Sequence, residues 1–402
     1  MQRSRHCFSL FVMGFCVLSG AIFLSAAEIH VSPRGSDTGD GTADHPFASV
    51  HRGQEAARAL RTRSGLNEPV IVLIAAGHYE LGRPLVFTPA DSGTAACPVT
   101  YRGVGVSRPI LSGGRRVEGF RREGDLWVAT IEGAKAGRWT FIQLYVNGRR
   151  RPRARTPNEG SYFRVRSALS GNKASRRGFR YAEGTVQDWD DIAQAVFVVY
   201  GSWYNTIHHV ESLDTENRIV HFTNSAGRPF DWYEGALRYY VENIAVALDA
   251  PGEWHLDTDS GRLSYFPLPG EKLEDLEVVA PVVSQTLVRF EGKPGTGPYV
   301  EHVRLENLSL EHTDAHFPSD LYDARQAATV QDAGILADGA RHCRIERCTV
   351  AHMGAHGIWF RDDCQHNRVR QCHVHDLGGG GVYIGEKWRW GGGCPGWAGY
   401  RN

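Results

Sequence analysis

The chain has 402 residues, and its 45 Lys and Arg residues are balanced by 45 Asp and Glu residues. A formal charge of zero argues against nucleic-acid binding as the main function, because counterion release from a phosphate backbone needs a basic surplus or a basic face. Hydrophobic residues at 42% and charged residues at 22% are ordinary for globular proteins and exclude a disordered or collagen-like chain.

Residues 1–27 have the pattern of a secretory signal. Two arginines precede an apolar run over residues 7–24, and three small residues follow. This order predicts cleavage after Ala27 and a secreted or periplasmic protein that has no membrane contact once the signal is removed. An uncleaved membrane anchor is the alternative, because the apolar run is long for a signal.

The next segments alternate between a helix and short apolar strands. Residues 46–63 are predicted to form an amphipathic helix, and strands are predicted at 69–74, 98–101 and 109–114. From about residue 123 the pattern changes to longer alternating strands with hairpin signals, of which Asn147-Gly148 is the strongest. We therefore predict an antiparallel β-sandwich inserted over residues 123–270.

The strongest internal signal is a repeat in the last third of the chain. Strands that begin at Gly334, Gly357 and Gly381 recur at intervals of 23 and 24 residues. Short alternating strands with this period indicate a solenoid, and the frame of a leucine-rich repeat is absent. The sequence predicts an all-β protein, a right-handed parallel β-helix whose cap and first coils occupy residues 28–122 and whose later coils occupy residues 271–402.

Alternation along each strand assigns the two faces of the repeat. Ile335, Ile358 and Val382 are expected to point inward. Trp359 and Tyr383 are then expected to stack on the outer face as an aromatic strip, because adjacent coils lie about 4.8 Å apart.

Cysteine usage does not indicate a disulfide scaffold. Two of the eight cysteines fall within residues 1–27, and no Cys-x-x-Cys pair supports a zinc site. Cys348 and Cys372 are 24 positions apart and are expected to stack as buried thiols in preference to a disulfide.

Polar residues follow the ends of aligned strands. By the same offsets, His312, His352 and Asp376 are expected to stack at one corner. The carboxylates near this corner and the aromatic strip, Asp376, Glu386 and Asp338, are the catalytic candidates, and His352 is expected to orient a neighbouring acid or raise its pKa.

Each candidate also has a structural explanation. Asp376 precedes a Leu-Gly pair and can hydrogen-bond its own turn. Asp338 lies opposite Arg361 and can form a cross-strand ion pair. The stacked His312 and His352 are better explained as a turn ladder than as metal ligands, because no complete ligand set is visible. No metal and no cofactor is therefore expected.

Substrate contacts are expected from two places. Trp359, Tyr383 and Arg361 lie on the outer strip, where large aromatic side chains are typical of binding sites. Arg153 and Arg155 belong to an arginine-rich run that can face acidic sugars such as uronates. The neutral overall charge disfavours this run as a nucleic-acid or heparin site.

Five segments resemble glycoside hydrolase family 141, including its inserted sandwich, and they lie at 29–37, 145–148, 153–157, 248–254 and 375–386. The resemblance implies action on plant or algal cell-wall glycans, with α-L-fucosidase and xylanase activities both represented. Members of the family continue for many more coils. We therefore expect an incomplete enzyme that is poorly soluble and weakly active or inactive, with the apolar side chains Val382 and Ile384 left exposed.

Together these features predict a secreted glycoside hydrolase that uses a pair of carboxylates on a polysaccharide or its side chains. We expect a monomer whose partner is a polysaccharide or an oligosaccharide. Two alternatives stay open. A polysaccharide lyase would need a Lys, Arg or Tyr base, and a carbohydrate-binding surface protein would use the aromatic strip without catalysis.

Overall fold

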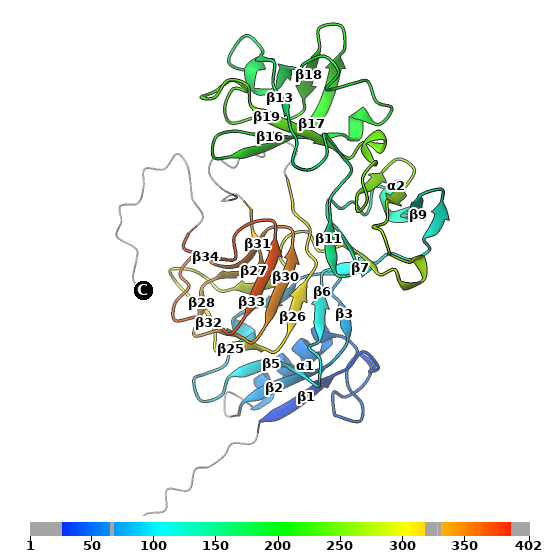
Figure 1. The fold of residues 1–402 in the computed structure, drawn as a ribbon. Coiled ribbons are helices and arrows are strands. Elements are labelled where there is room, and N and C mark those ends of the chain that lie inside the picture. Colours follow the sequence, from blue (N-terminus) through cyan, green and yellow to red (C-terminus); the bar gives the residue numbers. More distant parts are fainter. Residues whose placement is uncertain (1–25, 65–67, 318–327, 329–330, 387–402) are drawn as a thin grey trace, which may run out of the picture.

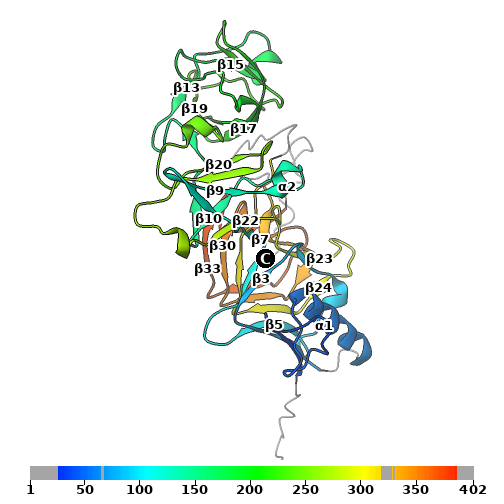
Figure 2. The same cartoon turned by 90° about the vertical axis from the view of Figure 1, so that its right-hand side faces the viewer.

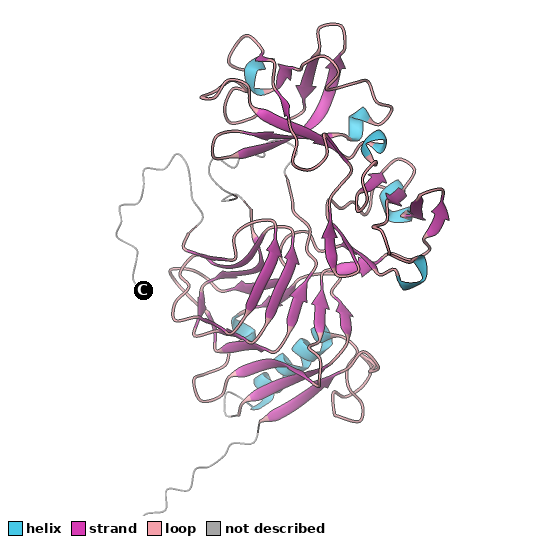
Figure 3. Cartoon of the chain, in the orientation of Figure 1, coloured by secondary structure: helices cyan, strands magenta, loops and turns pink. Residues whose placement is uncertain are grey.

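The computed structural model describes residues 26–64, 68–317, 328 and 331–386. A parallel solenoid forms one end of the molecule and an antiparallel insertion forms the other (Figure 1). Strands make up most of the regular structure, and all helices but one are short (Figure 3). No helix among the described residues is long and apolar enough to cross a membrane.

Three sheets, here called A, B and C, wrap around the core of the solenoid, and all of their strand pairs are parallel. Sheet A contains β1 (Ala27–Val31), β2 (Val70–Ala75), β5 (Val99–Val104), β25 (Val303–Glu306), β29 (Arg344–Glu346) and β32 (Arg368–Arg370). Sheet B contains β3 (His78–Glu80), β6 (Ile110–Ser112), β26 (Ser309–Glu311), β30 (Thr349–Met353) and β33 (His373–Leu377). Sheet C contains β4 (Leu85–Phe87), β23 (Val288–Glu291), β27 (Ala333–Asp338), β31 (His356–Phe360) and β34 (Val382–Ile384). A short pair joins β24 (Val300–Glu301) to β28 (Ala340–Arg341).

The register confirms the faces that the repeat predicts. Ile335 pairs with Ile358, and Ile358 pairs with Val382. Ile335 and Ile358 are fully buried in the core of the solenoid. Cys348 and Cys372 are both free thiols, as expected, and Cys348 is buried.

The corners between the sheets are built from residues with left-handed backbone. At the ends of the sheet B strands these residues are His312, His352 and Asp376, with φ angles of 65°, 56° and 49°. Asn, Asp and His tolerate this conformation better than other non-glycine residues. The same residue type can therefore recur from coil to coil and stack, and the rings of His312 and His352 lie 5.2 Å apart.

Helix α1 (Val50–Ser64) covers the first edge strand of sheet C. Gln54 Nε2 donates to the carbonyl oxygen of Val86 at 2.7 Å, and Arg58 donates to the same oxygen at 2.8 Å. Arg58 also forms an ion pair with the buried Asp91 at 2.6 Å, in the short helix η1 (Pro89–Asp91). The helix therefore occupies one carbonyl oxygen of the edge strand β4 and hinders pairing with another strand there.

The insertion leaves the solenoid after sheet B and returns before sheet C. Its root is the sheet of β11 (Arg149–Arg151), β10 (Leu144–Val146), β22 (Val278–Pro281) and β7 (Gly114–Arg116). A second sheet contains β20 (Trp254–Asp257), β21 (Arg262–Tyr265), β9 (Leu126–Thr130) and β8 (Arg121–Glu123). The large sheet contains β12 (Arg155–Thr156), β19 (Arg238–Glu242), β16 (Val196–Tyr200), β17 (Asn205–Asp214), β18 (Ile219–Phe222), β15 (Gly178–Arg180) and β14 (Ser167–Ala168), with β13 (Phe163–Arg164) beside β19. The short helices are α2 (Glu132–Lys135), η2 (Ala174–Arg176), η3 (Ile192–Gln194), η4 (Ala245–Ala247) and η5 (Leu273–Asp275).

The strands of the insertion are antiparallel, as the hairpin signals predict. The large sheet and the second sheet lie one above the other, on the side of the root that faces away from the solenoid (Figure 2). Two separate hydrophobic clusters fill the insertion, one under the large sheet and one between the root and the second sheet. The expected signal segment, apart from its last two residues, lies outside the described residues. The Gly-rich stretch after residue 386 also lies outside them.

Candidate active site

The corner after sheet B meets the root of the insertion. His352 Nδ1 lies 2.5 Å from Asp376 Oδ2, so the predicted stack of His312, His352 and Asp376 is confirmed. From the insertion, Arg150 Nε donates to Asp376 Oδ1 at 2.9 Å. Tyr145 donates its hydroxyl hydrogen to the carbonyl oxygen of His352 at 2.7 Å. We call Arg150, His352 and Asp376 the corner triad.

Both carboxylate oxygens of Asp376 are engaged in the corner triad. Burial alone would raise the pKa of Asp376, but the hydrogen bonds from His352 and Arg150 outweigh it and lower the pKa to about 2. Arg150 also donates to the carbonyl oxygens of Met353 and Asp376 at 2.9 and 3.0 Å. Asp376 is therefore an ionised anchor between the insertion and the coils.

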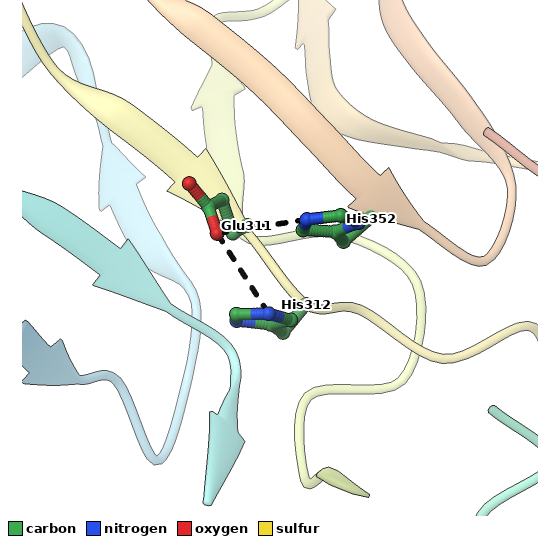
Figure 4. A group of neighbouring side chains, drawn as sticks. All are labelled: Glu311, His312 and His352. Atoms are coloured by element: carbon green, nitrogen blue, oxygen red, sulfur yellow. Dashed lines mark ion pairs between the residues drawn. The ribbon is translucent and has the colours of Figure 1, made fainter. Parts of the chain in front are cut away.

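Glu311, His312 and His352 are the described residues that come nearest to a metal-binding group (Figure 4). Glu311 Oε2 lies 3.7 Å from His312 Nε2 and 4.0 Å from His352 Nε2. Zinc bonds of about 2.0–2.1 Å place the ligand atoms of a tetrahedral site about 3.4 Å apart. The three side chains would therefore have to move closer to one another to bind zinc. His312 Nδ1 lies 3.0 Å from Ser112 Oγ, and burial, then the charge of His352, lowers the pKa of His312 well below its usual value. The stacked, nearly parallel rings of His312 and His352 therefore fit a turn ladder better than a metal site.

A cavity of about 290 Å³ lies next to this corner, between the solenoid and the insertion. One wall comes from the solenoid side, at Val282, Ser284 and residues 314–317, next to Pro281 at the end of β22. The other comes from the insertion, and its residues are Thr140, Phe141, Ile142, Arg153, Val196, Ile207, His209 and Glu242. The cavity is thus shaped by segments that are far apart in the sequence.

Asp314 is the buried acid in this cavity. It is 8% exposed, and its carboxyl oxygens accept the backbone N–H of Ile142 at 3.2 and 3.1 Å. Burial raises the pKa of Asp314 to about 7, although the Ile142 hydrogen bond acts in the opposite direction. A carboxyl group with such a pKa carries a proton for much of the time near neutral pH and can donate it.

Glu242 is the second acid in the cavity, and its surroundings differ. It ends β19 and pairs with Val196 across the large sheet. Its Oε1 accepts a hydrogen bond from Arg153 Nη1 at 3.1 Å. The positive charge of Arg153 also acts to lower the pKa of Asp314. One cavity therefore holds a buried carboxyl group that is readily protonated and a carboxylate paired with a guanidinium.

Comparisons with known families and structures follow the two parts of the fold. Residues 124–268 match the GH141 insertion domain, and residues 302–387 match the right-handed β-helix region. The chain therefore carries a GH141-type insertion domain and a right-handed β-helix. This confirms the predicted fold class, including its handedness.

The solved structures that resemble this GH141-like protein include one described as a glycoside hydrolase. It is 25% identical with a TM-score of 0.74, and the match covers 89% of this chain and 67% of that chain. Together with the insertion domain, this match supports a glycoside hydrolase. No curated protein matches the chain.

Two further structures are similar only at a low level. A complex of XylC with xylose is 12% identical with a TM-score of 0.35, and the match covers 87% of this chain and 54% of that chain. A GH136 lacto-N-biosidase from Eubacterium ramulus is 10% identical with a TM-score of 0.30, and the match covers 91% of this chain and 35% of that chain. Scores this low carry no argument about function.

The GH141-like protein does not bring Asp338 to the corner triad. Asp338 ends β27, whereas His356, which follows the corner, pairs with Ala333 at the start of that strand. Ala333 and Asp338 are five steps apart along the strand, which corresponds to about 16 Å. Asp338 instead accepts hydrogen bonds from Arg361 at 2.7 and 2.6 Å and is also paired with Arg289. Asp338 and Arg361 therefore form the cross-strand ion pair that was the structural alternative.

The aromatic strip stacks as predicted but is not an open platform. The rings of Trp359 and Tyr383 lie 4.5 Å apart at 27°. Trp359 is 0% exposed, because Tyr383 covers it and its Nε1 donates to the carbonyl oxygen of Gly385 at 2.8 Å. Tyr383 is half-buried, and Glu386 is exposed two residues after β34. The expectation that Trp359 offers a solvent-exposed face was wrong.

The arginine-rich run divides between two environments. Arg153 lines the cavity, as its assignment to substrate contacts would require. Arg155 stacks on the ring of Tyr240 at 3.7 Å and donates to the carbonyl oxygen of Pro157 at 2.9 Å. Asp314 and Glu242 were missed by the sequence analysis because neither belongs to a motif. The one sequence feature that could have indicated Asp314 is its position shortly after the end of a strand.

Proposed function

We propose that this GH141-like protein is an exported glycoside hydrolase that removes terminal sugars from cell-wall glycans. Asp314 would be the proton donor and Glu242 the second carboxylate. The observation that carries the proposal is one cavity with two carboxyl groups in unlike surroundings, the arrangement that separates acid from base in glycosidases. The signal pattern of residues 1–27 supports export.

The two acids would have separate tasks. Asp314 would protonate the glycosidic oxygen as the bond to the leaving group breaks. Glu242, held by Arg153, would either attack the anomeric carbon or activate a water molecule, according to whether the reaction retains or inverts the configuration. Neither task requires a metal or a cofactor.

The size of the cavity favours a small substrate group. Its volume of about 290 Å³ is just below the range of about 300–1,000 Å³ that is usual for ligand pockets. Such a volume suits a single terminal sugar better than a stretch of polysaccharide. Of the two activities that the family resemblance implies, α-L-fucosidase is therefore favoured over xylanase.

The test is hydrolysis of aryl α-L-fucosides, aryl xylosides and xylan by the wild type, Asp314→Asn and Glu242→Gln. We expect both variants to lose at least 100-fold in kcat, since general acid catalysis alone contributes about 10²–10⁴-fold. Asp314→Asn should keep more of its activity on a dinitrophenyl glycoside, whose leaving group needs no proton. Glu183→Gln, an exposed glutamate elsewhere on the insertion, is the matched control.

The products separate this function from its alternatives. Unsaturated sugars would identify a lyase, and glycan binding without products would identify a carbohydrate-binding protein. Full activity of both cavity variants, or loss of activity only in Asp376→Asn, would overturn the proposed carboxylate pair.

A further inference from the structure

The outer face of sheet A carries a column of arginines. Arg304, Arg344 and Arg368 occupy the same position on β25, β29 and β32, and each is paired in register with the next. Adjacent strands lie about 4.8 Å apart, so the three guanidinium groups follow the axis of the solenoid at that spacing. We call these residues the arginine column.

The charges of the arginine column are not compensated by ion pairs. No carboxylate among the described residues lies within 4.0 Å of any of its guanidinium groups, in contrast to Arg102, which binds Glu306 at 2.8 Å on the same face. Burial, then repulsion by Arg344, lowers the pKa of Arg304. Like charges on directly opposed strand positions destabilise a sheet. The charges of Glu306 and Glu346 act in the opposite direction on the pKa of Arg304 without forming an ion pair with it, so a bound anion would lower the cost that remains.

A column of histidines runs beside the arginines. The rings of His302 and His342 lie 5.0 Å apart at 5°, and those of His342 and His366 lie 4.9 Å apart at 14°. Both columns line an open hollow of about 520 Å³ on this face. Imidazole groups can donate hydrogen bonds to hydroxyl or anionic oxygens. The hollow thus carries a row of arginine side chains and a row of histidine side chains that can donate hydrogen bonds, and both rows follow the solenoid axis.

We infer that this hollow binds an anionic polysaccharide along the solenoid axis, with one acidic substituent for each coil. The planar guanidinium fork matches a carboxylate or a sulfate with two hydrogen bonds, and the coil spacing is close to the length of one sugar ring. The inference goes beyond the proposed function, because sheet A is a different face from the corner that holds the cavity. Among the described residues, the lining of the hollow contains no Phe, Tyr or Trp on which bases could stack, which favours a glycan over a nucleic acid as the polyanion.

Affinity gel electrophoresis of the full chain tests the inference. The probes are polygalacturonate, a sulfated fucan, neutral xylan and single-stranded DNA, each at low and high salt. We expect the wild type to be retarded by one or both acidic glycans, less strongly at high salt, and not by xylan. Arg344→Glu should weaken that binding more than tenfold, Arg344→Ala less, and Arg344→Lys least. The two acidic probes distinguish a carboxylate ligand from a sulfate ligand.

Arg122→Ala removes an exposed arginine from the insertion and should leave retardation unchanged. Because the arginine column repels itself, Arg344→Ala should fold with an equal or higher melting temperature. Equal retardation of the wild type and Arg344→Glu, equal binding of xylan, or tighter binding of DNA would each overturn the inference. Hydrolysis of a small neutral aryl glycoside should be unchanged in Arg344→Glu, so failure here is distinct from failure of the proposed catalytic cavity.

Discussion

Asp314 shows how burial can set the role of one side chain. With a pKa of about 7, its proton is present at acidic pH and is lost as the pH rises through neutrality. We expect kcat/KM to fall above about pH 7, because the proposed proton donor becomes ionised. A pH–rate profile on an aryl glycoside measures this limb, and activity that stays constant to pH 9 would contradict the assigned role.

The same shift makes a prediction about stability. The pKa of Asp314 is raised on folding from 3.8 to about 7, so the folded state binds the proton more tightly than the unfolded state. The contribution of this proton to the free energy of unfolding is fully present below about pH 4 and is lost as the pH rises through 7. The total loss is at most about 4 kcal/mol. Asp314→Asn should therefore flatten the pH dependence of the free energy of unfolding between pH 4 and 7. Urea titrations at several pH values measure it, and an unchanged slope would show that the carboxyl is not buried.

At the scale of elements, the hairpin of β10 and β11 joins the insertion to the coils through Arg150. Replacing Arg150 by Ala removes its hydrogen bonds to Asp376 and to the carbonyl oxygen of Met353. Hydrogen bonds to charged groups contribute about 1.5–3 kcal/mol, so we expect the free energy of unfolding to fall by about 2–3 kcal/mol. Chemical denaturation measures the change.

Arg149→Ala is the matched control for the hairpin. Arg149 lies beside Arg150 on β11 but is exposed, so its removal should alter stability by less than about 0.5 kcal/mol. Equal effects of the two substitutions would mean that the corner triad does not hold the insertion to the solenoid.

The periodic features of the sequence predict the coils, but contacts that do not repeat from coil to coil cannot be predicted from them. The stack of His352 on Asp376 and the pairing of Ile335 with Ile358 follow from a constant offset between coils, because each coil repeats the same backbone path. The cavity arises differently. Asp314 and Glu242 meet because the insertion folds back onto the corner, and no repeat relates their positions. The buried state of Trp359 was also missed, since alternation gives the face of a side chain but not what covers it.

At the scale of the whole molecule, one end of the described solenoid is apolar. Val382 is 48% exposed and Ile384 is 72% exposed, although both lie in phase with buried core positions of the preceding coil. Exposed apolar edge strands promote association between chains. We expect Ile384→Lys to raise the concentration at which light scattering detects aggregates several-fold. Val246→Lys, at an exposed position on the insertion, should have little effect, and equal gains would contradict the role of the edge.

The place where the insertion joins the solenoid also constrains the order of folding. Its two ends meet at Gly113, whose carbonyl oxygen accepts the N–H groups of Val282 and Val283, both at 2.8 Å. Arg102 and Glu306, which join neighbouring coils, are 204 positions apart in the sequence. Closing a flexible loop of roughly 170 residues costs about 3 kcal/mol more than closing a four-residue hairpin, and a folded insertion removes that difference. The insertion should therefore acquire protected amides before β5 pairs with β25, and pulse-labelled hydrogen exchange can observe this order. The inserted domain would then act as an internal template for the coils that follow it.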